Sequence, residues 1–167
     1  TLRLAHALPG LADITGLNMR DVERLQASAV TLTAAQLNGF ERVAGVGDQG
    51  LNIKLATSGA IDLSGRLDLT TSAVAFIASG GGDTILMDPA YGGNFNFSTD
   101  VVSTRGDFIR AARGNDEIRT GQGADTVLGG AGGDTLRGDS GADSLRGEAG
   151  NDLLRGDENF GAQGNAT

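Results

Sequence analysis

The sequence predicts an all-β solenoid, in which short strands follow one another along the chain and stack in successive coils. The C-terminal part repeats a nine-residue unit with one aliphatic residue per copy, and the N-terminal part has short apolar runs separated by Gly-rich turns. Gly makes up 28 of the 167 residues, about 17% against an average near 7%. Such a chain can bury a narrow aliphatic core, but not the broad core of a large globular enzyme.

The nine-residue unit occupies residues 111–155 in five consecutive blocks, AARGNDEIR, TGQGADTVL, GGAGGDTLR, GDSGADSLR and GEAGNDLLR. The fourth position is always Gly: Gly114, Gly123, Gly132, Gly141 and Gly150. The sixth is always Asp: Asp116, Asp125, Asp134, Asp143 and Asp152. The eighth is always aliphatic: Ile118, Val127, Leu136, Leu145 and Leu154. The preceding block, residues 102–110, keeps Asp107 but has Arg105 in place of Gly.

These three columns have a physical meaning. A Gly two residues before an Asp permits a tight loop or a close backbone approach. A single aliphatic residue between polar neighbours is a short strand with one side chain inward. Each unit buries too little to fold alone, so it must stack on its copies. Stacking aligns the Asp carboxylates, and a hard dication with six to eight oxygen ligands, such as Ca²⁺, resolves their repulsion better than Mg²⁺ does.

The blocks resemble the RTX, or haemolysin-type calcium-binding, nonapeptide family, whose consensus is G-G-x-G-x-D-x-U-x. The resemblance covers about 45 residues strongly (five blocks of nine). It implies a parallel β-roll with two nonapeptides per turn and Ca²⁺ clamped between loops that stack one turn apart. In the family, the lower loop gives its first and third carbonyls and its Asp. The upper loop gives its second and fourth carbonyls and its Asp.

Carried over to this chain, the resemblance implies the pairs Asp116 with Asp134, Asp125 with Asp143 and Asp134 with Asp152, and a weaker pair of Asp107 with Asp125. The implied lower-loop carbonyls are those of Ala111, Arg113, Thr120, Gln122, Gly129 and Ala131. The implied upper-loop carbonyls are those of Gly121, Gly123, Gly130, Gly132, Asp139, Gly141, Glu148 and Gly150. Asp143 has no such partner in the next loop, because Gly161 stands where Asp is needed.

Residues 1–100 lack this register but read as short strands between polar turns. The expected strands are Val22–Leu25, Val30–Thr33, Phe40–Val43, Leu51–Leu55, Ile61–Leu63, Leu67–Leu69, Val74–Ile77 and Thr84–Met87. Thr33 and Gln36 form a capping box for a short helical turn that ends at Gly39, residues 91–97 look like a loop, and residues 81–85 repeat the GxDxU pattern once. A β-sandwich and a parallel β-helix both fit the strands. We favour a β-helix over 1–100 that shares one core with a β-roll over 101–167.

Composition excludes several function classes. With 21 acidic and 13 basic residues the net charge is −8, which disfavours nucleic acid and anionic membrane surfaces. The longest apolar run has six residues, far short of the roughly 20 that span a bilayer. The chain has no Cys, one His, and neither HExxH nor GxSxG, so we expect no catalytic residue within it. Ca²⁺ is the one expected cofactor.

The expected function is that of a calcium-binding repeat region of a secreted bacterial protein. The resemblance implies that the chain leaves the cell unfolded by type I secretion and folds on Ca²⁺ binding outside. We expect a structural or adhesive role in a surface layer or other extracellular assembly, with self-association or contact with an extracellular surface or polysaccharide. The alternative is a carrier module of a secreted enzyme (protease, lipase or polysaccharide epimerase) whose catalytic domain lies outside this chain.

Overall fold

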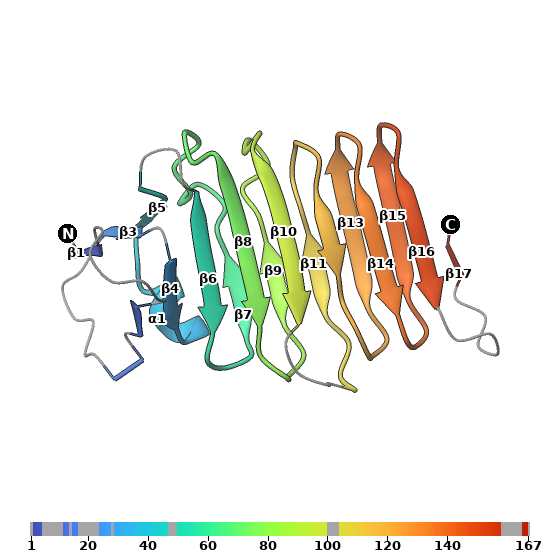
Figure 1. Ribbon diagram of the computed structural model, residues 1–167, viewed down its shortest axis with the longest axis horizontal. Coiled ribbons are helices and arrows are strands. Elements are labelled where there is room, and N and C mark those ends of the chain that lie inside the picture. The colour runs from blue at the N-terminus through green and yellow to red at the C-terminus, as the bar shows by residue number, and fades with distance from the viewer. Residues whose placement is uncertain are drawn as a thin grey trace.

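The computed structural model describes residues 2–4, 12–13, 15–16, 24–27, 29–46, 50–99, 104–157 and 165–166. Within them the chain forms a succession of short strands wound into an elongated solenoid, with the N-terminal part at one end and the C-terminal part at the other (Figure 1). Every strand pairing is parallel. The all-β solenoid expected from the repeats is therefore confirmed.

Two long sheets and one short sheet make up the solenoid. The first, here called the long sheet, contains β2 (Ala12–Asp13), β4 (Ala29–Leu32), β6 (Leu51–Leu55), β8 (Ala73–Ala78), β10 (Asn94–Thr99), β12 (Glu117–Arg119), β14 (Thr135–Asp139) and β16 (Leu153–Asp157). The opposite sheet contains β7 (Ala60–Asp62), β9 (Thr84–Leu86), β11 (Phe108–Arg110), β13 (Thr126–Ala131), β15 (Ser144–Ala149) and β17 (Asn165–Ala166). The short sheet contains β1 (Leu2–Leu4), β3 (Arg24–Ala27) and β5 (Arg42–Ala44).

The core lies between the long sheet and the opposite sheet. In-register pairing stacks one buried residue per strand into a column on each side. The long-sheet column is Val30, Ile53, Phe76, Phe97, Ile118 and Leu136, ending at the partly buried Leu154. The opposite column is Ile61, Ile85, Ile109, Val127 and Leu145. The inward direction predicted for the eighth position of each repeat is thus confirmed for its first four members.

At the edges of this core the side chains change character along the solenoid axis. A second position of the long sheet lies next to the column just described. In the earlier coils it is occupied by Leu51, Val74 and Phe95. In the later coils it is occupied by Asp116, Asp134 and Asp152. Two positions after each member of the opposite column, the side chain becomes smaller along the solenoid, from Leu63 and Met87 through Ala111 to Gly129. An edge packed by large apolar groups therefore becomes an edge of Asp and Gly.

Several local predictions are confirmed. β6 spans Leu51–Leu55 as predicted, and the other strands fall within two residues of their predicted bounds where they are described. Residues 22–23 of the first predicted strand lie outside the described residues. The helix α1 (Ala34–Asn38) carries the predicted capping box between Thr33 and Gln36, followed by Gly39.

Two local predictions are wrong. The predicted loop at 91–97 contains most of β10, where Phe95 and Phe97 point inward and Asn94 and Asn96 point outward. Gly92 and Gly93 precede that alternation and obscured it. The predicted strand Leu67–Leu69 is only a single bridge between Val43 and Leu67.

Both sheets pass residue 100 without a break, because β10 pairs with β12 and β9 pairs with β11. The division into units 1–100 and 101–167 stays a prediction. In the described part of the chain, no helix has the length and apolar character needed to cross a bilayer.

Candidate metal centre

Four aspartates form a ladder beside the opposite sheet. This first Asp ladder consists of Asp83, Asp107, Asp125 and Asp143, each of which immediately precedes a strand. The backbone N–H of Asp83 donates to Oδ1 of Asp107 at 2.8 Å, and that of Asp107 donates to Oδ1 of Asp125 at 2.7 Å. The N–H of Asp125 donates to Oδ1 of Asp143 at 3.0 Å. Each carboxylate thus caps the loop one coil before it.

A second Asp ladder, Asp116, Asp134 and Asp152, precedes the strands of the long sheet in the same way. The N–H of Asp116 donates to Oδ1 of Asp134, and that of Asp134 to Oδ1 of Asp152, each at 2.9 Å. Asp116 itself accepts from the N–H of Phe95 at 2.8 Å. Because β13 and β15 run opposite to β14 and β16 in Figure 1, the two ladders lie on opposite edges of the solenoid.

Direct contacts therefore join the four residue pairs implied by the resemblance. Asp107 with Asp125, Asp116 with Asp134, Asp125 with Asp143, and Asp134 with Asp152 are each 18 positions apart and hydrogen bonded from backbone to carboxylate. Their use as metal ligands stays a prediction. Gly161, which would face Asp143 in the next coil, lies outside the described residues.

The second oxygen of most of these carboxylates has no partner. Oδ2 is buried without a hydrogen bond in Asp83, Asp116, Asp125, Asp134 and Asp143. These five residues are at most 5% exposed. A buried carboxylate oxygen with no donor is costly when it is charged, unless a cation or a proton joins it.

The pKa values of the ladder residues reflect this burial. Desolvation raises the pKa of Asp107 and that of Asp116 to about 7, with a smaller contribution from the neighbouring carboxylates. Desolvation also raises the pKa of Asp83 to about 6. The pKa values of Asp125, Asp134 and Asp143 are raised by the same cause. Negative charge on the ladder carboxylates is therefore unfavourable at neutral pH.

Glycines in the last three loops let the Asp carboxylates approach the loop backbone closely. A Cβ added to Gly129 would overlap Oδ2 of Asp134, and one added to Gly138 would overlap Oδ2 of Asp143. Gly147 has the same relation to Asp152. The residue five positions before the Asp is larger in earlier coils, where it is Ala111 for Asp116 and Thr120 for Asp125. The absence of a side chain in the last three loops leaves each carboxylate facing bare backbone.

The loop backbone brings carbonyl oxygens into the same region. Gly141 has φ 136°, and a Cβ there would overlap the carbonyl oxygen of Gly123 one coil before. Gly132 and Gly150 stack in the same way on the carbonyls of Gly114 and Gly132. Fourth-position Gly is therefore required by both backbone conformation and close approach.

The remaining implied ligands also lie in these stacked loops. The first-position residues Ala111 and Thr120 directly follow β11 and β12, and Gly129 lies within β13. The third-position residues Arg113, Gln122 and Ala131 form bridges between coils. The carbonyls of Gly121 and Ala131 accept the N–H groups of Ser140 and Gly114, at 2.8 and 2.9 Å. Each carbonyl oxygen has a second lone pair for a cation. Gly130, Asp139 and Glu148 occupy the second position with positive φ.

The donor set fits a hard cation that accepts carbonyl ligands. Among the described residues no three His, Cys, Asp or Glu side chains converge into a metal site. A cation in a ladder would therefore need backbone carbonyls beside one or two carboxylates. That mixture is characteristic of Ca²⁺, and soft-ligand metals would find neither thiolate nor imidazole here.

Sequence reasoning missed two features of this region. It found the GxDxU pattern at 81–85 but not that Asp83 hydrogen bonds directly to Asp107, because 24 positions rather than 18 separate them. It also missed the replacement of an apolar edge column by Asp at Asp116. The signal for both is strand register, which the variable coil lengths of the N-terminal half conceal.

Comparison with known proteins identifies the repeats. The family model for the RTX calcium-binding nonapeptide repeat (4 copies) matches residues 103–136 and 128–159. Searches of curated proteins and of solved structures found no match for the chain. The matched segment holds all of the second Asp ladder and the last three members of the first. Residues 103–159 are therefore RTX calcium-binding nonapeptide repeats, and the described residues among them, 104–157, are wound as a parallel β-roll.

Proposed function

We propose that the two Asp ladders bind Ca²⁺ between stacked loops and that the coils from Asp116 onward fold only when it is bound. One observation carries this proposal: coil by coil, large apolar edge residues give way to a buried Asp whose Oδ2 has no partner and faces a Gly. The lost hydrophobic contacts and the buried, unpaired charge both destabilise these coils without an ion. A bound Ca²⁺ supplies the missing positive charge.

The ligand set proposed for each site follows the pairing of the loops. The lower loop would contribute its Asp and the carbonyls of its first and third residues, and the upper loop its Asp and the carbonyls of its second and fourth. Asp134 belongs to two such sites, with Asp116 below and Asp152 above. Asp107 shares a site with Asp125, in a loop that has Arg105 in place of Gly.

Folding that depends on Ca²⁺ suits a protein that works outside the cell. Extracellular calcium modules typically have Kd values on the order of 10⁻⁴ to 10⁻³ M, so they stay empty in the cytosol and fill outside. We therefore propose a secreted protein that is exported unfolded and folds after release. Binding and folding would then be one event.

We propose a structural or adhesive role for the folded solenoid, because its N-terminal coils continue the same parallel sheets. On the outer face of the long sheet, Arg119, Arg137 and Arg155 stand in register, which would suit an acidic polysaccharide or a neighbouring molecule. The alternative role, as a carrier module of a secreted enzyme, rests only on the match to the repeat family. The complete reading frame distinguishes them: a catalytic domain elsewhere in it supports the carrier role.

Calcium binding can be tested by titrating Asp134→Asn and Asp116→Asn variants with Ca²⁺ in a calorimeter. Asp134 serves two sites, whereas Asp116 serves one because Phe95 precedes it by one coil, so we expect the larger loss of Ca²⁺ affinity in the Asp134 variant. Asn keeps the oxygen that accepts the backbone N–H, so both variants should still fold in excess Ca²⁺. Equal losses would contradict pairing at 18 residues, and absence of binding to the unmodified chain would contradict the whole proposal.

A further inference from the structure

The loop 79–83 lies outside the matched repeats yet has the ladder geometry. The carbonyl of Asp83 accepts the N–H of Phe108 at 2.8 Å, as the carbonyl of Asp107 accepts that of Thr126. The N–H of Asp83 donates to Oδ1 of Asp107, and its own Oδ1 accepts the N–H of Gly59 at 2.8 Å. Asp83 therefore makes the same backbone contacts as the other members of the first Asp ladder. The coil from Asp83 to Asp107 is nevertheless six residues longer than the 18-residue coil from Asp107 to Asp125.

Two buried oxygens in this loop have no partner. Oδ2 of Asp83 is unpaired in a residue that is 1% exposed, and Oγ of Ser79, at the other end of the loop, is buried and also unpaired. A carboxylate oxygen is a common Ca²⁺ ligand, and a hydroxyl oxygen is a neutral oxygen donor that can complete such a set. Buried polar groups in folded proteins normally have a hydrogen-bond partner, so two buried oxygens without one call for an explanation.

The loop is stacked closely between its neighbours. A Cβ on Gly81 would overlap the Ser58 hydroxyl, and one on Gly82 would lie 2.9 Å from the carbonyl oxygen of Gly106. Backbone oxygens from the coils on both sides are thus within reach of the loop. A cavity of about 570 Å³, lined by Thr57, Ser58, Ser79 and Arg105 among others, opens beside it.

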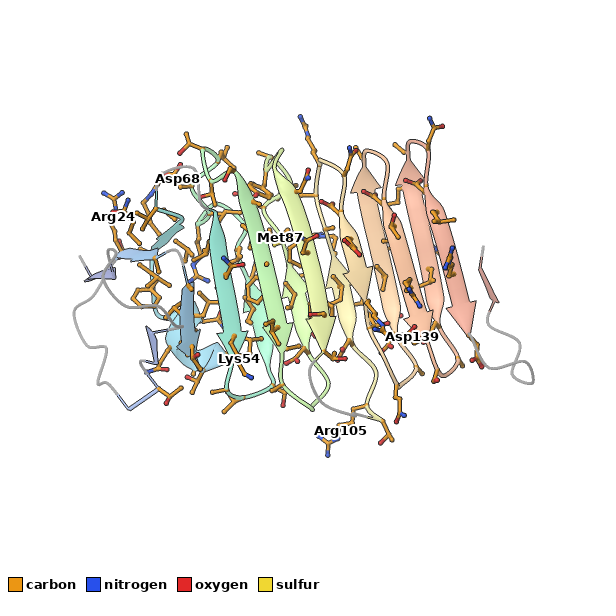
Figure 2. All side chains as sticks on the ribbon, in the orientation of Figure 1. Arg24, Lys54, Asp68, Met87, Arg105 and Asp139 are labelled. Atoms are coloured by element: carbon orange, nitrogen blue, oxygen red, sulfur yellow. The ribbon has the colours of Figure 1, made fainter. Side chains whose placement is uncertain are left out.

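Arg105 is the one basic residue that lines this cavity. Its side chain is exposed and extends away from the ribbon at the lower edge in Figure 2.

We propose that a divalent cation of the Ca²⁺ class binds between the loop 79–83 and Asp107, with Asp83 and Ser79 as side-chain ligands. This site rests on the proposed calcium binding by the ladders but lies one coil before the matched repeats. It would extend the ion column into the half of the solenoid whose opposite edge is still apolar, at Phe95. The ion would thereby join the two halves.

The test is to count the Ca²⁺ ions bound to the full chain by native mass spectrometry across a Ca²⁺ titration. We expect Asp83→Asn to bind one ion fewer than the unmodified chain and Ser79→Ala to fill one site at a several-fold higher Ca²⁺ concentration. Asp88→Asn is the matched control. Asp88 is also buried in the N-terminal half, but its two oxygens accept the N–H groups of Ala90 and Gly65 at 2.9 and 2.7 Å.

The outcomes separate this proposal from the previous one. An unchanged ion count in Asp83→Asn, with ions bound to the unmodified chain, overturns the added site and leaves the repeat sites standing. A chain that binds no ion at all overturns both. If Asp83→Asn does not fold, an unchanged titration of Ser79→Ala overturns the added site.

Discussion

A left-handed backbone recurs at the second position of four consecutive loops. Gly121 and Gly130 adopt φ 87° and 108°, as Gly does without strain. Asp139 and Glu148 adopt φ 64° and 71° in spite of their Cβ atoms. Asp139 forms ion pairs with Arg119 and Arg137 that offset part of this cost. Glu148 is exposed, and its charge raises the pKa of Asp134, so it adds both backbone strain and repulsion.

Replacing Glu148 by Gly should therefore stabilise the folded roll. A left-handed residue with a Cβ costs about 1–2 kcal/mol, and the extra freedom of Gly in the unfolded chain returns about 0.5–1 kcal/mol of that. We expect a net gain of about 0.5–1 kcal/mol in the free energy of unfolding in excess Ca²⁺, measured by denaturant titration. Glu148→Ala removes the charge but keeps the Cβ, so it should gain less. An equal gain in both variants would show that backbone strain at this position is negligible.

At the scale of the elements, the spacing between coils differs along the solenoid. In the repeats, 18 residues per coil place each Asp over the last one, opposite Gly129, Gly138 or Gly147. In the N-terminal coils the spacing is 23 residues from Leu51 to Val74 and 21 from Val74 to Phe95. Large apolar side chains fill the edge of those coils, and no cation is needed there.

A methyl group added at Gly129 should weaken calcium binding. Gly129→Ala would place a Cβ against Oδ2 of Asp134, where the proposed ion binds. Gly129 is not in the left-handed region, so Ala adds no backbone strain. We expect a loss of roughly tenfold or more in Ca²⁺ affinity by calorimetry, about 1.4 kcal/mol or more.

The control for this substitution is Gly133→Ala in the same loop. A Cβ there would lie 3.2 Å from the carbonyl oxygen of Asn151 and away from the Asp134 carboxylate. Its Ca²⁺ affinity should stay close to that of the unmodified chain. Comparable losses in the two variants would place the ion elsewhere.

The same difference in spacing explains how much could be predicted from the sequence. The repeat fixes a period, so the inward column from Ile118 to Leu145 and the four Asp pairs follow from it. No period relates Phe95 to Asp116 or Asp83 to Asp107, because insertions of different length separate them. Strand existence could be predicted from local apolar patterns, but coil-to-coil register in the N-terminal half could not.

The whole molecule thus combines an end with apolar edges and an end with acidic edges on one continuous pair of sheets. Figure 2 shows Met87 in the interior near the middle of the solenoid and Asp139 at the lower edge of its C-terminal part. In the first end, buried side chains such as Phe76 and Phe95 pack edge to face, with ring centroids 6.0 Å apart. In the second, hydrophobic burial is reduced to about one side chain per strand.

Stability should depend on pH in opposite directions with and without calcium. The folded-state pKa values of Asp83, Asp107 and Asp116 are raised from 3.8 to about 6–7. The ion-free fold therefore holds more protons than the unfolded chain, so its stability is greatest below about pH 4 and falls as pH rises through 6–7. Ca²⁺ competes with these protons, so Ca²⁺ affinity should rise over the same range.

Thermal unfolding at pH 5 and pH 8 checks this dependence. In excess chelator we expect the higher Tm at pH 5, and in millimolar Ca²⁺ we expect the higher Tm at pH 8. The same order of Tm values under both conditions would show that the ladder carboxylates do not control stability.

Hydrogen exchange of the full chain, with chelator and with millimolar Ca²⁺, tests the dependence of the acidic coils on calcium most directly. In chelator at pH 8, amides of β6, β8 and β10 should stay protected, because apolar side chains pack both sides of those coils. Amides of β14, β15 and β16 should exchange rapidly in chelator and become protected when Ca²⁺ is added. Equal protection of β14, β15 and β16 in the two conditions would contradict calcium-dependent folding.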